Sequence, residues 1–532
     1  GFPDVYLSQC DGTPMNTDSA PNSLFVNQDG RFTKITCGLE NTGLTQGTTV
    51  GDFNNDGFDD VFVCNIGQNN LYRNNGDGTF TDVTATLGLI DDAQTLQTNP
   101  WSSSAAIGDI DGDGIPDLYV CSYCEGQNAL NNACYGDPPL QHRSCSPLVY
   151  PAALDRVWKG GTDGRFAEST NEWLAEQTPG RGLGLVLGSL DQRPGNDIYV
   201  ANDMTSNHYW SAINPKGRYT NDASSTAFQL TDQSAVRGLA VNRRSLSQAS
   251  MGIAAGDADG DGDLDMFLTH FTNDHNTFYE QIRGSTFTDS SDVSNLAADS
   301  VNLLGWGTQF VDGNNDGRLE LFIANGHVDD FTHDDLSFRM PPQLYRRGQS
   351  GRWNMQVSES TGDYFEKNWL ARATARLDAN ADGRVDMVVT HLFDPVALLI
   401  NETQATTTNN GNCITVRVVG DTANRDAIGA VLTLQRGQDE QASSQTRYVL
   451  AGNGYHCRNA PQLHFGLGQA SETTQPMRLS VQWPDGETSQ HAIRPDASGE
   501  WLIVQGQESL TKIMANTITN NVANGHSNAS QN

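Results

Sequence analysis

The sequence predicts an all-β protein: a seven-bladed β-propeller whose first blade is truncated, followed by a small β-sandwich-like domain. Three observations predict this fold. An acidic loop recurs at intervals of roughly 55–80 residues, similar short strands surround each copy, and the pattern changes after residue 402. We expect a propeller over residues 1–402, a β domain over 403–509 and a flexible tail over 510–532.

Five intact copies of the acidic loop mark the repeats. They read GDFNNDGFDDVFV, GDIDGDGIPDLYV, GDADGDGDLDMFL, VDGNNDGRLELFI and LDANADGRVDMVV. Counted from its first Asp, each loop has Asp or Asn at position 3, Asp at 5, Gly at 6 and an acid at 9. Hard cations such as Ca²⁺ take about six to eight oxygen ligands, and the glycine permits the sharp turn around the ion. Because an apolar strand follows position 9, we interpret these segments as calcium loops between strands.

About five calcium ions are therefore expected, one in each intact loop. The side chains of positions 1, 3, 5 and 9 and the backbone carbonyl of position 7 are the candidate ligands. They are Asp52, Asn54, Asp56, Phe58 and Asp60; Asp109, Asp111, Asp113, Ile115 and Asp117; Asp257, Asp259, Asp261, Asp263 and Asp265; Asp312, Asn314, Asp316, Arg318 and Glu320; Asp378, Asn380, Asp382, Arg384 and Asp386.

A sixth copy, GSLDQRPGNDIYV at 188–200, departs from this pattern. Ser189 occupies position 1 and Arg193 occupies position 5, where every other loop has Asp. A guanidinium at position 5 is a fixed cation that can pair with Asp191 or Asp197. We expect no calcium in this loop.

The segments between the loops predict propeller blades. A strand of small residues precedes each loop, and an apolar strand, an Asn-aromatic strand and a G-x-F/Y/W strand follow it, as in SMGIAA and NTFYEQIRGSTFTD. Four-stranded antiparallel units at this period are typical of propellers. Gly1 aligns with Gly114, so the first unit begins inside a loop without its inner strand, and we expect a truncated chain. The unit at 372–402 lacks its fourth strand, and an open edge favours completion by a strand from elsewhere.

A different pattern follows the polar linker TQATTTNNGN. Alternating strands surround NRDAIGA, GNGYHC, HFGLG and WPDG, which indicates a small β domain. The repeats resemble FG-GAP or VCBS repeats, and these four motifs resemble the ASPIC/UnbV module. Together they resemble the cartilage acidic protein family. That resemblance implies an extracellular calcium-binding propeller linked to adhesion or matrix interaction, and it implies no defined catalytic activity.

Composition limits the partners. The formal net charge is −32, and five divalent cations would bring it only to about −22, which argues against nucleic acids and anionic membrane surfaces. No apolar run is long enough to span a membrane, and no signal peptide is visible. Nine cysteines and calcium loops favour a secreted, extracellular or cell-surface protein.

The cysteines suggest several disulfides. We predict a bond between Cys413 and Cys457, and Cys10 and Cys37 are candidates for another. Four cysteines crowd the 121–145 insertion; structural disulfides are favoured there over a redox or metal pair, and three connectivities are open. They are Cys121, Cys124, Cys134 and Cys145. Cys64 remains, either buried or bonded to another chain.

Four histidines follow apolar strands and would converge on one propeller face. They are His270, His275, His327 and His391. A metal or catalytic cluster is one interpretation; separate loop histidines bonded to backbone are favoured. The leading functional hypothesis is therefore a non-catalytic protein that binds an extracellular protein or glycan, or associates with itself. The alternatives are a secreted enzyme of the carbohydrate lyase or dehydratase type, with a metal site on that face, and a scaffold presenting the C-terminal domain.

Overall fold

The computed structural model describes most of the chain, and the account below concerns those residues alone. They are 2–10, 20–91, 100–126, 132–136, 143–212, 228–357, 361–403, 412–422, 424–437, 443–468, 477–494 and 499–513. Strands dominate them. The helical segments are single turns: η1 (Pro147–Val149), α3 (Thr170–Trp173), α4 (Ser234–Arg237), η3 (Thr332–Asp334) and η5 (Asp363–Glu366).

Strands in the first 399 residues form consecutive antiparallel groups. They are β1 (Val5–Leu7), β2 (Ser23–Gln28) and β3 (Arg31–Ile35); β4 (Leu44–Gly51), β5 (Asp60–Ile66), β6 (Asn70–Asn74) and β7 (Phe80–Asp82); β8 (Pro100–Gly108), β9 (Asp117–Glu125), β10 (Arg156–Gly160) and β11 (Phe166–Glu168); β12 (Gly182–Gly188), β13 (Asp197–Asn202), β14 (His208–Ala212) and β15 (Leu230–Asp232); β16 (Ile253–Gly256), β17 (Asp265–Leu268), β18 (Thr277–Ile282) and β19 (Thr286–Asp289); β20 (Gly305–Val311), β21 (Glu320–Asn325), β22 (Gln343–Arg347) and β23 (Trp353–Met355); β24 (Ala371–Leu377), β25 (Asp386–His391) and β26 (Ala397–Leu399).

This order confirms the predicted all-β class and the propeller-type blades. Within each group, strands adjacent in sequence are adjacent in the sheet, as in a propeller blade. The first group lacks an inner strand and the last lacks an outer one, as the repeats indicated. The number of seven blades stays a prediction, because a pairing of Ile66 with Trp101 joins β4–β7 and β8–β11 into one eight-stranded sheet.

Residues 412–513, here called the C-terminal module, form two four-stranded sheets. One has the order β31-β27-β34-β35 and the other β29-β28-β32-β33. The strands are β27 (Asn412–Val419), β28 (Val431–Arg436), β29 (Ser443–Tyr448), β31 (Leu463–Gly468), β32 (Met477–Gln482), β33 (Thr488–Ile493), β34 (Gly499–Val504) and β35 (Thr511–Ile513). β35 pairs with β34, although the sequence placed it in the tail. The rest of the expected tail, 514–532, lies outside the described residues.

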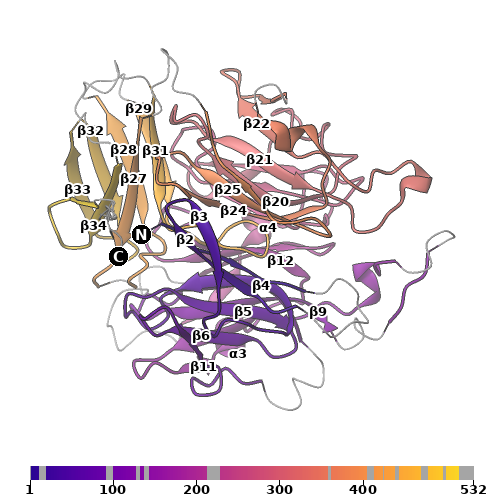
Figure 1. Cartoon of the computed structure of the whole chain (residues 1–532), viewed down its shortest axis with the longest axis horizontal. Helices are drawn as coiled ribbons and strands as arrows, with labels where there is room; N and C mark the ends of the chain where they lie inside the picture. The colour runs from indigo at the N-terminus through magenta and orange to yellow at the C-terminus, as the bar shows by residue number, and fades with distance from the viewer. Residues whose placement is uncertain are drawn as a thin grey trace, which may run out of the picture.

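The module and the blades share one apolar core. Buried side chains of the blades, such as Tyr119 and Leu187, belong to the same cluster as Ile414, Ile428 and Trp483 of the module. Figure 1 shows the module, in orange to yellow, packed beside the blades. The two parts therefore form a single packed body.

A segment of the module enters the centre of the blades. β30 (Ala451–Gly452) adds a fifth strand to the sheet of β12–β15, and Gly454 pairs with Ile253 of β16. Further along, the side-chain amide of Asn459 donates to the side-chain oxygen of Gln309 in β20 at 3.1 Å. We call residues 451–460 the central segment, because it contacts the inner strands of successive blades.

The end of the central segment lies where the first blade lacks its inner strand. The amide of Ala460 donates to the carbonyl of Arg376 in β24 at 3.0 Å. The carbonyl of His456 accepts from the amide of Thr48 in β4 at 3.3 Å. Since β24 and β4 belong to the last and second groups, residues after 402 bridge the gap between them.

The predicted Cys413–Cys457 disulfide is wrong. Both thiols are free, with the Cys413 sulfur 2.8 Å from the carbonyl of Gly383 and the Cys457 sulfur 3.1 Å from the carbonyl of Thr374. The sequence placed Cys457 on a strand of the module. In the structure Cys457 belongs to the central segment and contacts Thr374 of β24 instead. Cys10 and Cys37 are not joined in a disulfide either.

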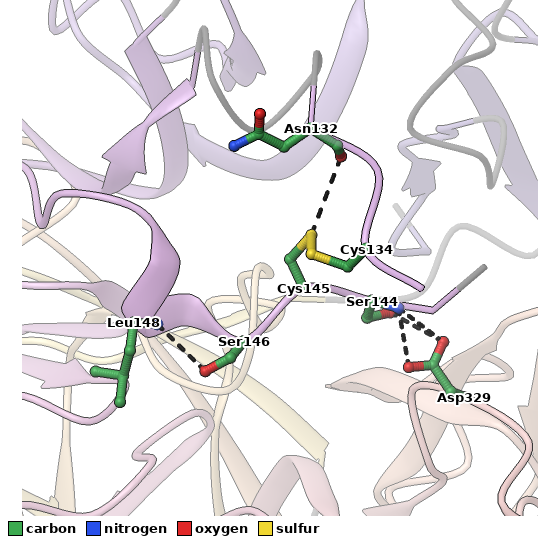
Figure 2. The surroundings of a disulfide bond; sticks show 7 residues. All are labelled: Asn132, Cys134, Ser144, Cys145, Ser146, Leu148 and Asp329. Atoms are coloured by element: carbon green, nitrogen blue, oxygen red, sulfur yellow. Dashed lines mark hydrogen bonds between the residues drawn. A yellow bond between two sulfur atoms is a disulfide. The ribbon is translucent and has the colours of Figure 1, made fainter. Parts of the chain in front are cut away.

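The cysteine-rich insertion contains one disulfide, Cys134–Cys145, while Cys121 and Cys124 are buried thiols, as is Cys64. Figure 2 shows that the neighbouring Ser144 donates its amide to the carboxylate of Asp329, at 2.9 Å to Oδ2. Asp329 follows β21, so this insertion reaches from the third group of strands to the sixth. A disulfide next to the contact restricts the loop that makes it.

Candidate metal centres

All five predicted loops share two hydrogen bonds that set their shape. The carboxylate of position 9 accepts the amide of position 2; the donors are Phe53, Ile110, Ala258, Gly313 and Ala379, at 2.8–3.2 Å. The carboxylate of position 5 accepts the amide of position 7; the donors are Phe58, Ile115, Asp263, Arg318 and Arg384, at 2.8–2.9 Å. The loops are therefore five copies of one conformation.

Position 1 anchors the turn. In the first loop, Asp52 accepts the amides of Asp56 at 2.9 Å and Gly57 at 2.7 Å, and the loops that begin at Asp109, Asp312 and Asp378 repeat both bonds. Gly57 has φ 92°, a left-handed conformation that glycine adopts without strain. Position 6 is thus a glycine because the chain must turn sharply there.

The carboxylates converge closely enough for a calcium ion. Ligand oxygens of Asp109, Asp111 and Asp117 lie within 4.8 Å of one another, and the loop at Asp257 has a similar group with Asp259 and Asp261. Two oxygens on opposite sides of Ca²⁺, each about 2.3–2.6 Å from it, are about 5 Å apart. These two donor sets, which consist only of oxygen, fit the ion that the sequence predicts.

Burial concentrates unfavourable charge at positions 1 and 9. Burial, and after it the charges of Asp111 and Asp113, raise the pKa of Asp109 to about 7. The pKa of Glu320 rises to about 8 for the same reasons, burial first and then the charge of Asp312. A cation among these groups would favour their ionised forms.

The sixth loop supplies its own cations. The guanidinium of Arg193 donates from Nε to Asp191 at 2.7 Å, and Arg237 of α4 donates to the same carboxylate at 2.8 Å. Burial alone would raise the pKa of Asp191, but the hydrogen bond and charge of Arg193 and the charge of Arg237 outweigh it and lower the pKa. The predicted pairing of Arg193 is therefore confirmed for Asp191, and Arg237 is a partner that the sequence did not reveal.

Basic side chains beside the intact loops were also missed. Lys159 of β10 contacts Asp111 and lies 2.7 Å from a carboxylate oxygen of Asp113, and Arg346 of β22 contacts Asp316. Both residues follow the aromatic residue of the third strand in their blade, as in VWK and LYR. The corresponding residue in β18 is the acid Glu280, so the charge at this position differs between blades.

The predicted histidines have different partners, although His270 and His275 lie near each other. The ring of His270 contacts the Thr277 hydroxyl at 3.1 Å, and the ring of His391 contacts the Tyr364 hydroxyl at 2.9 Å. His327 packs edge-on against Phe271, at 5.5 Å between ring centroids. Among the described residues, three or more acidic, histidine or cysteine ligand atoms lie within 4.8 Å of one another only in the loops at Asp109 and Asp257, and neither group includes a histidine.

Comparisons with known proteins agree with the motifs. The FG-GAP-like repeat model matches residues 52–120, and the ASPIC and UnbV model matches residues 420–510. Cartilage acidic protein 1 of Xenopus tropicalis is 23% identical over 86% of this chain, and the Homo sapiens protein of that name is 22% identical, also over 86%. The chain spans 64% and 62% of those two relatives' lengths. These matches confirm the resemblance that the sequence motifs indicated.

Solved structures resemble the chain only weakly. An Agrocybe aegerita lectin that recognises non-reducing terminal N-acetylglucosamine aligns with 73% of this chain and 90% of its own, at 12% identity and a TM-score of 0.39. The exotype rhamnogalacturonan lyase YesX aligns with 73% and 81%, at 11% identity and a TM-score of 0.30. At these scores the likeness carries no argument about function. None of the helices described is both long and apolar enough to cross a membrane.

Proposed function

We propose that this chain, an FG-GAP-repeat protein similar to cartilage acidic protein 1, is an extracellular calcium-binding scaffold with a non-catalytic role in adhesion, matrix contact or self-association. One observation carries the proposal: five loops hold their acids in the same hydrogen-bonded conformation, while the sixth replaces an acid with Arg193, which pairs with Asp191. Positions 1, 3, 5 and 9 and the carbonyl of position 7 would hold each ion. Calcium there would supply charge compensation, not a reactive group.

An open strand edge supports the interaction role. β26 pairs only with β25 among the described strands. Three apolar side chains along it are exposed: Val396, Leu398 and Ile400, by 37–43%. Because an unpaired edge with apolar side chains readily accepts a further strand, self-association through β26 is the partner mode that we favour.

The enzyme alternative has less support. The histidines have separate partners, and the central segment occupies the region where a propeller funnel would hold a substrate. We therefore keep the carbohydrate lyase or dehydratase hypothesis only as the alternative that metal analysis tests.

The decisive experiment counts metal ions and chains together. Purified protein equilibrated with calcium and freed of unbound ions should contain about five calcium ions per chain, and Asp257→Asn should remove one. Asp363→Asn, at an exposed acid outside the loops, is the control.

Light scattering should show larger assemblies for the native chain than for Leu398→Lys. Fewer than three calcium ions, or a stoichiometric transition metal, would contradict the scaffold; identical masses would contradict association through β26.

A further inference from the structure

A cavity of about 100 Å³ lies between the blades and the C-terminal module. Its walls come from the inner strands β16, β20 and β24, from β29, and from the central segment and the residues that follow it. The cavity is therefore formed only when the module docks on the blades.

Three arginines line this cavity: Arg376 of β24, Arg447 of β29 and Arg458 of the central segment. The guanidinium of Arg376 donates to the carbonyl of Phe310 at 2.6 Å, and that of Arg447 donates to the carbonyl of His464 at 2.9 Å. No carboxylate of the described residues forms an ion pair with either group, and the third guanidinium lies 3.5 Å from Asp426.

Two carboxylates also line the cavity, Asp312 and Asp378, but each is position 1 of a calcium loop. Once calcium binds, the ion neutralises the charges of these two carboxylates. They then no longer compensate the positive charges of the arginines. This step rests on the proposed function. Buried like charges without compensation are costly, and an anion would remove that cost.

Unused hydrogen-bonding groups surround the same space. Nε of Arg376 and Nη1 of Arg458 are buried donors without a partner in the described structure. The side-chain oxygens of Asn453 and Gln462, which also line the cavity, are likewise unpaired. The two guanidinium donors are therefore available to an anion, whereas the two amide oxygens accept hydrogen bonds only and need a donor such as water.

We propose that this cavity binds one small tetrahedral oxyanion, sulfate or phosphate, between Arg376 and Arg458, whose unpaired donors Nε and Nη1 lie in it. The planar fork of a guanidinium matches two oxygens of such an anion. The cavity volume of about 100 Å³ exceeds what a single bound water needs and leaves room for one small oxyanion. The anion would join the module to the blades, because its two arginines come from different parts of the fold.

The first test identifies what the native protein holds. Calcium-loaded protein is dialysed into chloride buffer free of both oxyanions and then denatured, and ion chromatography measures the released sulfate and phosphate separately. We expect about one oxyanion per chain, and its identity distinguishes the two sources. An anion lost during dialysis is detected by the second test.

The second test measures melting in calcium while sulfate or phosphate replaces chloride at constant ionic strength. The native chain should show a saturable rise of about 3 °C or more at 100 times the Kd. Arg376→Gln should abolish the saturable part, and Arg376→Lys should retain a weaker one. Arg478→Gln, at an exposed site of the module, should behave as the native chain and report the general effect of sulfate.

The outcomes separate this inference from the proposed function. Five calcium ions with no released oxyanion and no saturable shift would overturn the oxyanion site alone. A saturable shift that persists in Arg376→Gln would also overturn it. If Arg376→Gln does not fold, the release and melting measurements on the native chain decide the question. Absence of calcium in the same samples would overturn the proposed function instead.

Discussion

Single charged residues decide how each loop balances its acids. In the sixth loop, Arg193 and Arg237 surround Asp191, and the pKa of that carboxyl is lowered despite its burial. In the loop at Asp109, burial and neighbouring acids raise the pKa to about 7. The same loop shape therefore admits two solutions, an internal guanidinium or an external cation.

Arg237→Gln should destabilise the protein equally with and without calcium. Arg237 is 4% exposed and donates to Asp191 at 2.8 Å, so its loss leaves a buried carboxylate with Arg193 alone. We expect a loss of about 1–3 kcal/mol in the free energy of unfolding. Denaturant titrations in calcium and in chelator measure it, with exposed Arg283→Gln as the control. A loss confined to chelator-treated protein would show that calcium replaces the guanidinium and that the sixth loop also binds the ion.

Lys159→Met should strengthen calcium binding at one loop. The ammonium group contacts Asp111 and Asp113, so it competes with a cation for both carboxylates. Because this pair is partly exposed, we expect a gain of about 1 kcal/mol, or about fivefold in affinity. Calorimetric titration of calcium measures the gain, and exposed Lys34→Met is the control. The gain should vanish in an Asp109→Asn background; weaker binding in Lys159→Met would instead make the lysine a supporting group.

Local spacing predicted the loops, but not the residues that neutralise them. Positions 1 to 9 are consecutive residues of one loop, so their pattern is visible in the sequence. The pairing of Arg193 with Asp191 follows from that pattern, because both residues belong to the same loop. Arg237 is distant in the sequence and reaches Asp191 only through packing of α4. A single sequence does not show such a contact.

At the scale of elements, the central segment changes the role of the C-terminal module. The sequence predicted a small β-sandwich-like domain, and the two sheets agree with that prediction. The sequence did not predict that the segment GNGYHC lies outside those sheets. The strand next to it, β30, has only two residues and pairs with β12, which is far away in the sequence. The error in the Cys413–Cys457 disulfide follows directly from this.

Gly452→Ala should loosen the central segment. A Cβ at Gly452 would lie 2.2 Å from the carbonyl oxygen of Leu185, and φ there is 75°. Gly506 is a matched control, because its φ is 77° and a Cβ there would have no atom within 4 Å. Both variants should lose about 1–2 kcal/mol to left-handed strain, and Gly452→Ala should lose about 2 kcal/mol more.

Equilibrium unfolding measures those losses, and hydrogen exchange should show the Asn453 amide, which donates to Leu185 at 2.8 Å, losing protection only in Gly452→Ala. Equal losses in the two variants would mean that the central segment adapts to the added methyl group without cost.

At the scale of the whole molecule, the blades and the module form one packed unit, on which the proposed calcium ions would act. The core that contains Leu187 of the blades also contains Ile414 and Trp483 of the module. The central segment crosses between blades that carry calcium loops. Loss of the ions should therefore weaken both parts together, because neither can expose its half of the core without exposing the other.

Chelation should lower the melting temperature of the entire chain in a single step. Each ion that binds only the folded state contributes about 2.7 kcal/mol at 100 times its Kd, so five ions should raise the melting temperature by about 10 °C or more. Scanning calorimetry with calcium, with chelator and with calcium restored measures the shift and its reversal, and magnesium alone serves as the control ion. The transition should remain single, since the shared core of Leu187 and Trp483 opens only once. Two separated transitions, with the module melting first and unaffected by chelator, would show that calcium stabilises the blades without the module.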